Sequence, residues 1–230
     1  MPPPKRIEVH PRPRSMVENT QGLVLRTRPL TETSLIVHWL TPGLGRIATV
    51  AKGARRPQSP FRGKVDLFYL VDLSFSRSRR SDLHTLREVM LRETHSALRR
   101  GLACLRQASY AAALVEQTTE TETPLPAVFQ LMTGLLAHLP AQPAQPITLF
   151  ALEMKLLVEL GLRPELKKNT LSPGARQVLA RIADLDWASV ARLKPSAAQT
   201  REIQQFLHGF LVYHLGKVPA GRDAALAATV

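Results

Sequence analysis

The chain has 230 residues, 44% of them hydrophobic, with a formal net charge of +13 and a pI near 10.8. This length and apolar content suffice for one large or two small globular domains. So large an excess of cations is unusual in an enzyme of small molecules and typical of a protein that meets DNA, RNA or anionic lipid.

Cysteine content and hydropathy exclude further classes. The single cysteine, Cys104, cannot form an intrachain disulfide or a cysteine-based zinc site, and the seven His residues show no metal-ligand spacing. No run approaches the roughly eighteen apolar residues of a membrane span, and the N-terminus lacks the apolar stretch of an export signal. We therefore expect neither a metal nor a membrane-spanning or exported protein.

The positive charge is concentrated in the first half of the chain. Residues 1–100 hold 19 Lys/Arg against 8 Asp/Glu, a balance of +11, whereas residues 101–230 hold 12 against 10, a balance of +2. Residues 1–15 contain five prolines and the cations Lys5, Arg6, Arg12 and Arg14, which predicts a mobile basic tail. The asymmetry indicates an anion-binding module followed by a module with another task.

Period-two hydrophobic patterning predicts five strands after this tail. They cover residues 22–28, 33–40, 46–51, 65–75 and 83–91, separated by turn-forming Pro and Gly residues. A meander of five short strands predicts an OB-fold barrel over residues 16–94, with a small SH3-like barrel as the alternative.

Helical periodicity replaces the strand pattern in the second half. Apolar residues predict helices over 98–115, 128–139 and 147–160, and cap signals at Ser172 and Ser196 open two more over 174–182 and 200–215. The predicted fold class is thus α+β and multidomain: a five-stranded OB-fold β-barrel followed by an all-α helical bundle over 95–230. Its larger aromatic residues are expected in the core, with a partner groove as the alternative: Trp187, Phe206, Phe210 and Tyr213.

A basic loop between the third and fourth predicted strands is the main candidate site. Gly and Pro residues exclude a regular helix there, so five cations without an intervening acid are displayed on a loop: Lys52, Arg55, Arg56, Arg62 and Lys64. Such a cluster suits phosphate oxygens, because Arg presents a fixed fork of donors and each neutralised phosphate releases counterions. Arg77, Arg79 and Arg80 in the next turn are expected to lie close to it. A solvated loop that aids solubility is the alternative.

Signatures of catalysis are missing from the sequence. It contains neither a Walker-type phosphate loop nor a G-x-S-x-G motif, and the scattered acids of the basic half do not predict the carboxylate cluster of a metal-dependent nuclease. The residues predict a binding protein rather than an enzyme, with no cofactor.

Five segments follow one another in a specific order: Gln21-Gly22-Leu23-Val24-Leu25, Glu32-Thr33-Ser34, Gly45-Arg46, Ala51-Lys52-Gly53-Ala54-Arg55-Arg56 and Asp82-Leu83-His84-Thr85-Leu86-Arg87-Glu88. Together they resemble the RecO family of bacterial recombination mediators. The resemblance is strong over residues 17–92 and looser at Ala108-Ser109-Tyr110, Phe129-Gln130-Leu131 and Gly161-Leu162-Arg163-Pro164.

This resemblance implies a function and partners. Members bind single- and double-stranded DNA, anneal complementary strands and assist recombinase loading with RecR and single-stranded-DNA-binding protein, in the bacterial cytoplasm at the nucleoid. An RNA-binding OB-fold protein of RNA metabolism or translation is the alternative, because the same charge pattern would serve it.

The resemblance also implies a peptide site and one departure. The acidic tail of single-stranded-DNA-binding protein ends in a hydrophobic residue, so it needs an apolar pocket beside a cation. We expect Phe129 and Phe150 as anchors, with Arg106 and Lys155 as carboxylate partners. Many members carry a four-cysteine zinc insert after the G-L-x-P segment, whereas the corresponding residues near 166–172 here contain no cysteine.

Overall fold

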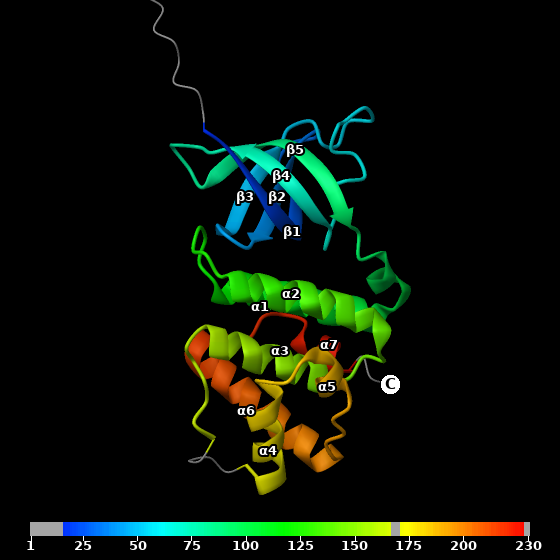
Figure 1. Cartoon of the computed structure of the whole chain (residues 1–230), viewed down its shortest axis with the longest axis vertical. Helices are drawn as coiled ribbons and strands as arrows, with labels where there is room; N and C mark the ends of the chain where they lie inside the picture. The colour runs from blue at the N-terminus through cyan, green and yellow to red at the C-terminus, as the bar shows by residue number, and fades with distance from the viewer. Residues whose placement is uncertain (1–15, 167–170, 228–230) are drawn as a thin grey trace, which may run out of the picture.

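The computed structural model describes residues 16–166 and 171–227. The predicted basic tail, residues 1–15, and residues 167–170, where the family's zinc insert would begin, lie outside the described residues. The described residues form a barrel stacked on a body of helices along the long axis of the molecule (Figure 1).

The barrel is closed and five-stranded over the described residues, with the strand order β1-β2-β3-β5-β4. All neighbouring strands pair antiparallel except β3 and β5, which pair in parallel. This architecture confirms the predicted OB-fold barrel. Its strands are β1 (Val17–Pro29), β2 (Leu35–Thr41), β3 (Gly45–Ala51), β4 (Leu70–Ser76) and β5 (Leu83–Glu93).

Strand β2 is apolar on both faces because each face serves a different core. Val37 and Trp39 point into the barrel, where the Trp39 indole N–H donates to Thr49 Oγ1 at 2.8 Å. Leu40 faces outward and packs into the helical core. The hydrogen bond satisfies the one polar atom of the indole, so the large side chain can be fully buried.

A β-bulge in β1 divides this strand between the same two cores. The register with β2 shifts between Val24 and Arg26, which leaves Leu25 as the extra residue. Val24 consequently points into the barrel, while Leu23 and Leu25 both belong to the helical core. The bulge therefore joins the two halves of the molecule through continuous apolar packing.

The fourth strand is shorter than its sequence pattern predicts. It starts at Leu70 rather than residue 65, because Phe68 adopts a positive φ of 66° and turns the chain. The Phe68 N–H donates to Val24 O at 3.0 Å, and its ring is buried at 1% exposure. The preceding residues, including Val65 and Leu67, form turns that belong to the loop after β3.

The helical half follows the predicted order, with boundaries set by caps. Ser172 caps α4 through the Ala175 N–H, and Ser196 forms a capping box with Gln199, both as predicted. The expected helix 98–115 is divided at Gly101. The helices are η1 (Ser96–Arg100), α1 (Leu102–Thr118), α2 (Pro126–His138), η2 (Leu139–Ala141), α3 (Pro146–Glu159), α4 (Pro173–Ile182), α5 (Trp187–Ala191), α6 (Ala197–Leu215) and α7 (Arg222–Leu226).

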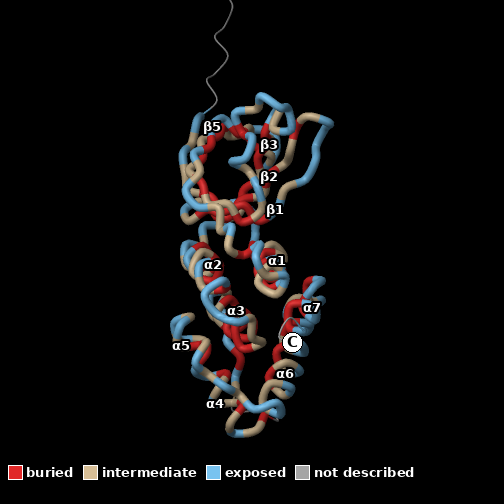
Figure 2. The backbone as a smooth tube through the Cα atoms, turned by 90° about the vertical axis from the view of Figure 1, so that its right-hand side faces the viewer, coloured by how far each residue is buried: buried red, intermediate tan, exposed pale blue. Residues whose placement is uncertain are grey.

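The core of the helical half is built around α3. This helix is buried along most of its length, and the tube in Figure 2 shows its red buried residues between the surrounding helices. Trp187, Phe206 and Phe210 pack partly against this core. The expectation was wrong for Tyr213, which is 84% exposed, because α6 buries the row that contains Leu207 and Leu211 and Tyr213 lies on another face.

A buried polar group fastens α7 to α1 and α3. Arg222 on α7 donates to both carboxylate oxygens of Glu153 on α3, at 2.7 and 2.9 Å. The Tyr110 hydroxyl on α1 donates to the same carboxylate at 2.6 Å. Arg222 is 3% exposed and Glu153 is fully buried, so all three groups depend on one another for their hydrogen bonds.

No helix in the described part of the chain is long and apolar enough to cross a membrane. The predicted division at residues 94 and 95 falls between the end of β5 and the start of η1, and the domain bounds themselves stay a prediction.

Candidate nucleic-acid interface

The loop after β3 displays its cations on the surface of the barrel. Gly53 and Gly63 have positive φ angles of 68° and 70°, so the chain makes successive turns instead of a helix. Within the described part of the chain, no ion pair engages any of the loop cations. The five exposed side chains are Lys52, Arg55, Arg56, Arg62 and Lys64.

Backbone contacts hold this loop against the barrel. The Arg55 N–H donates to Thr33 O at 3.0 Å, and the Gly53 N–H donates to Ser34 Oγ at 3.3 Å, which fixes the loop on the turn between β1 and β2. Phe61, at 7% exposure, inserts its ring into the barrel core. The cations are therefore carried by an anchored loop, which reduces the conformational entropy lost on binding.

The turn between β4 and β5 differs from this loop in one respect. Arg79 and Arg80 are exposed, but Arg77 is bound to Glu18 at 2.6 Å and to Glu122 at 2.8 Å. The hydrogen bond to Glu18 is the main cause that raises the pKa of Arg77. Arg77 thus ties the turn to β1 and to the α1–α2 loop.

The two basic loops do not lie close together, contrary to the sequence-based expectation. Figure 1 draws the turn after β4 on the side of the barrel where β1 begins, and the loop after β3 on the other side. Backbone contacts explain the separation: the Arg77 N–H bonds to Met16 O, whereas the Arg55 N–H bonds to Thr33 O. Each loop follows the strand end to which it is joined.

Two further cations lie on β1 and were not singled out from the sequence. Arg26 pairs with His38 across β1 and β2, and Arg28 pairs with Ile36, so both arginines share the outer face of the barrel. Both are exposed, and Arg26 lies 3.1 Å from Glu116 of α1. Their alternation in the pattern Leu-Arg-Thr-Arg was the signal that could have placed them outward.

Two family models match the chain, one over the barrel and one in the helical half. Residues 16–95 match the family model described as recombination protein O N terminal, and residues 103–170 match the one described as recombination protein O C terminal. The chain belongs to the RecO family.

Curated relatives support the assignment. The chain is 27% identical over 235 residues to the DNA repair protein RecO of Anaeromyxobacter dehalogenans, which covers 87% of this chain and 92% of that relative. It is 32% identical over 151 residues to RecO of Bacillus subtilis, covering 66% and 58%. It is 35% identical over 153 residues to RecO of Roseiflexus sp., covering 66% of this chain and 53% of that relative. The chain therefore spans little more than half the length of the Bacillus and Roseiflexus relatives.

Of the four residues expected to hold a partner peptide in this RecO-family chain, two are buried and a third already binds backbone carbonyls. Phe150 is fully buried and Phe129 is 7% exposed, so both rings are core residues and cannot serve as anchors. Lys155 donates to Ala183 O at 3.1 Å and to Leu185 O, and lies 5.8 Å from the Trp187 ring. These contacts explain why Lys155 is not free to bind a carboxylate.

Arg106 remains as a surface cation. It lines a groove of about 230 Å³ between α1 and residues 220–224, beside Leu102, Leu105 and Tyr110. Leu102 is 64% exposed in this groove. An apolar floor with one cation at its edge is the arrangement expected for a peptide that ends in a hydrophobic residue and a carboxylate.

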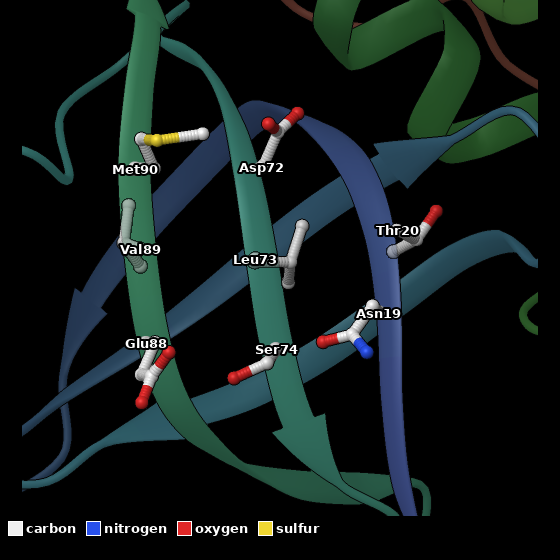
Figure 3. Close-up of a pocket in the computed structure, with 8 residues that line it drawn as sticks. All are labelled: Asn19, Thr20, Asp72, Leu73, Ser74, Glu88, Val89 and Met90. Atoms are coloured by element: carbon white, nitrogen blue, oxygen red, sulfur yellow. The ribbon is translucent and has the colours of Figure 1, made fainter.

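An open hollow of about 500 Å³ on the outer face of β1, β4 and β5 does not suit a phosphate (Figure 3). Its lining includes Asp72 and Glu88 but no Lys or Arg, and Met90 is 54% exposed beside them. Among the described residues, no group of three or more His, Cys, Asp or Glu is placed to hold a metal ion.

Proposed function

We propose that this chain is a non-enzymatic recombination mediator of DNA repair, which binds single- and double-stranded DNA, anneals complementary strands and assists recombinase loading in the bacterial cytoplasm at the nucleoid. Membership of the RecO family supports the role in repair and recombination. The observation that carries DNA binding is the anchored loop after β3, whose five exposed cations face solvent without carboxylate partners among the described residues.

The loop contributes affinity that does not depend on sequence. Each phosphate that a cation neutralises releases counterions, so the logarithm of the affinity falls with the logarithm of the salt concentration by about 0.7 per contact for a single strand and about 0.9 for a duplex. Arg79 and Arg80 form a second contact region on the other side of the barrel. Arg77 belongs to this turn but acts mainly through its carboxylate partners.

Replacement of both Arg55 and Arg56 by Ala tests this proposal. Fluorescence anisotropy with matched single-stranded DNA, duplex DNA and RNA should show weaker binding of unrelated DNA sequences and a salt slope smaller by about 1.4 for a single strand. Ala at Arg181 and Arg201 is the matched control, because both are exposed cations of the helical half, on α4 and α6. An unchanged slope in the loop variant would place the DNA elsewhere. Tighter binding of RNA would favour the RNA-binding alternative.

Annealing requires no nucleotide or metal in this proposal. Cations on one surface lower the repulsion between two phosphate backbones, which raises the rate of strand encounter without chemical energy. Annealing of complementary oligonucleotides should therefore proceed in EDTA and without ATP. A strict requirement for either would contradict the mechanism.

We further propose RecR and single-stranded-DNA-binding protein as partners, with the acidic tail of the latter in the groove beside Arg106. The groove supports this by its exposed Leu102 and its apolar floor. Calorimetry with the tail peptide and the whole chain should show binding that Arg106→Ala weakens and Arg163→Ala, at an exposed site near α4, does not. Equal binding by both variants would exclude the groove.

A further inference from the structure

A second, smaller pocket lies where the barrel meets the α1–α2 loop. It has a volume of about 130 Å³, room for roughly four water molecules at about 30 Å³ each. Its floor is the outer face of three adjacent strands, because Arg26 of β1 pairs with His38 of β2, and His38 pairs with Ala48 of β3. Arg46, two residues before Ala48, lies on the same face.

The α1–α2 loop forms a fixed wall of this pocket. Thr121 makes a β-bridge with Arg46, and the Glu122 N–H donates to Arg46 O at 2.8 Å. The Arg46 guanidinium donates in turn to Thr119 Oγ1 at 2.8 Å. The Glu122 carboxylate is held by Arg77 and His84, both at 2.8 Å. Because backbone and side chains both fasten the wall, the pocket exists before any ligand binds.

One lining residue, His38, has a ring nitrogen without a hydrogen-bond partner among the described residues. His38 Nε2 is buried and has no hydrogen-bond partner among the described residues, while His38 Nδ1 lies 3.9 Å from Glu116 Oε1. Burial, together with the charges of Arg26, Arg28 and Arg46, lowers the pKa of His38 to about 4, so its ring is neutral at pH 7. A buried polar atom without a partner favours a ligand that supplies one.

The charges around the pocket restrict what that ligand is. Arg26 and Arg46 supply donors, whereas Asp82 and Glu122 at the rim supply acceptors. The two carboxylates repel a phosphate, and a wholly apolar ligand would leave His38 Nε2 without a hydrogen-bond partner. A neutral, flat ligand with donors and acceptors side by side meets both conditions. The edge of a nucleobase has this character, and a pyrimidine ring suits the volume.

We propose that this pocket takes one unpaired nucleobase from a single strand. The inference rests on the proposed function, since the strand must first be held by the cations of the barrel. A base in a duplex has its edge occupied by its complement and cannot enter, so the pocket adds affinity for single strands alone. It also requires that a base leave the pocket before its complement can pair.

Abasic DNA tests the pocket in the whole chain. The protein should bind a single strand about tenfold more tightly than an abasic strand of equal length and charge, given the usual contribution of one bound base. Ala48→Trp fills the pocket and should remove most of this difference while leaving duplex binding unchanged. Val50→Trp is the matched control, because Val50 is the next outward residue of β3 and does not line the pocket. Ala48→Leu repeats the test with a smaller side chain, should the Trp variant fail to fold.

The NMR resonances of the His38 ring give an independent readout. They should shift on addition of the single strand and stay in place with the abasic strand. If the protein bound normal and abasic strands equally tightly, and Ala48→Trp behaved like Val50→Trp, the nucleobase pocket would be refuted while the proposal of DNA binding would stand. The same ring shift with inorganic phosphate alone would show an anion site instead. If the whole chain bound no nucleic acid at any salt concentration, both proposals would fail.

Discussion

Removal of the Arg222 guanidinium should destabilise the helical half more than any surface substitution. Arg222 is 3% exposed and Glu153 is fully buried, so Arg222→Met leaves a buried carboxylate that still accepts a hydrogen bond from the Tyr110 hydroxyl but has lost its cation. Burial lowers the pKa of Arg222, but the hydrogen bonds to Glu153 outweigh burial and raise it, so the guanidinium stays charged. Breaking a buried pair on one side typically costs about 3–5 kcal/mol.

Two companion variants separate the charge from the packing. Tyr110→Phe removes one hydrogen bond to a charged group and should cost about 1.5–3 kcal/mol. Glu153→Leu added to Arg222→Met removes the unpaired charge as well, and should recover more than half of the stability lost in the single variant. Because three groups share one carboxylate, their effects should not add.

Urea unfolding followed by circular dichroism measures these differences as shifts of the midpoint at unchanged slope. The reasoning is refuted if Arg222→Met costs less than about 1 kcal/mol, the level of an exposed ion pair. It is refuted equally if Glu153→Leu does not rescue the single variant, because the loss would then come from packing rather than from the buried charge.

Two further predictions concern the contact between barrel and helices. A Cβ at Gly45, where φ is +66°, would lie 1.9 Å from Thr123 O, so Gly45→Ala should cost roughly 3 kcal/mol or more. Gly63→Ala, at φ +70° with open space around it, should cost only about 1 kcal/mol in the same urea assay, and equal losses would contradict the steric argument. Burial and the nearby Arg charges lower the pKa of His38 to about 4 in the folded protein, against 6.5 for an unperturbed histidine, so the unfolded chain binds more protons between these values. Stability should fall as pH drops from about 6.5 to about 4. His38→Leu should reduce that fall and His208→Leu, at an exposed site on α6, should not; a fall of the same size in both variants would exclude His38 as its cause.

Local sequence patterns predicted the architecture well, because apolar residues alternate along the strands and recur with the helical repeat along the longer helices. The strand prediction failed at residues 65–69, where Val65 and Leu67 continue the alternation but Phe68 turns the chain. Nothing in the local pattern marks this turn, since it depends on hydrogen bonds between Phe68, Tyr69 and Val24 of another strand. The two five-residue helices α5 and α7 are too short to show a period.

Local composition predicted the basic loop of the site, but it could not predict contacts between residues that are far apart in the chain. Charge density alone predicted the loop cations, and all five are exposed. The role of Arg77 could not be foreseen, because its partners Glu18 and Glu122 are 59 and 45 residues away in the chain. Phe150 was mistaken for a surface anchor because α3 is apolar on nearly every side, so its sequence does not distinguish one face from another.

The bulge in β1 has a consequence for synthesis of the protein. Leu23, Leu25, Leu40 and Phe68 of the barrel are buried only once the helices cover them. The ribosome releases the barrel first, so this apolar patch is exposed to water until α1, α2 and α3 have been made. During translation, a barrel whose strands are fully hydrogen-bonded therefore still exposes an apolar patch that can aggregate. The time needed to synthesise the chain between β5 and α3 determines how long a nascent molecule can associate with its neighbours or with a chaperone.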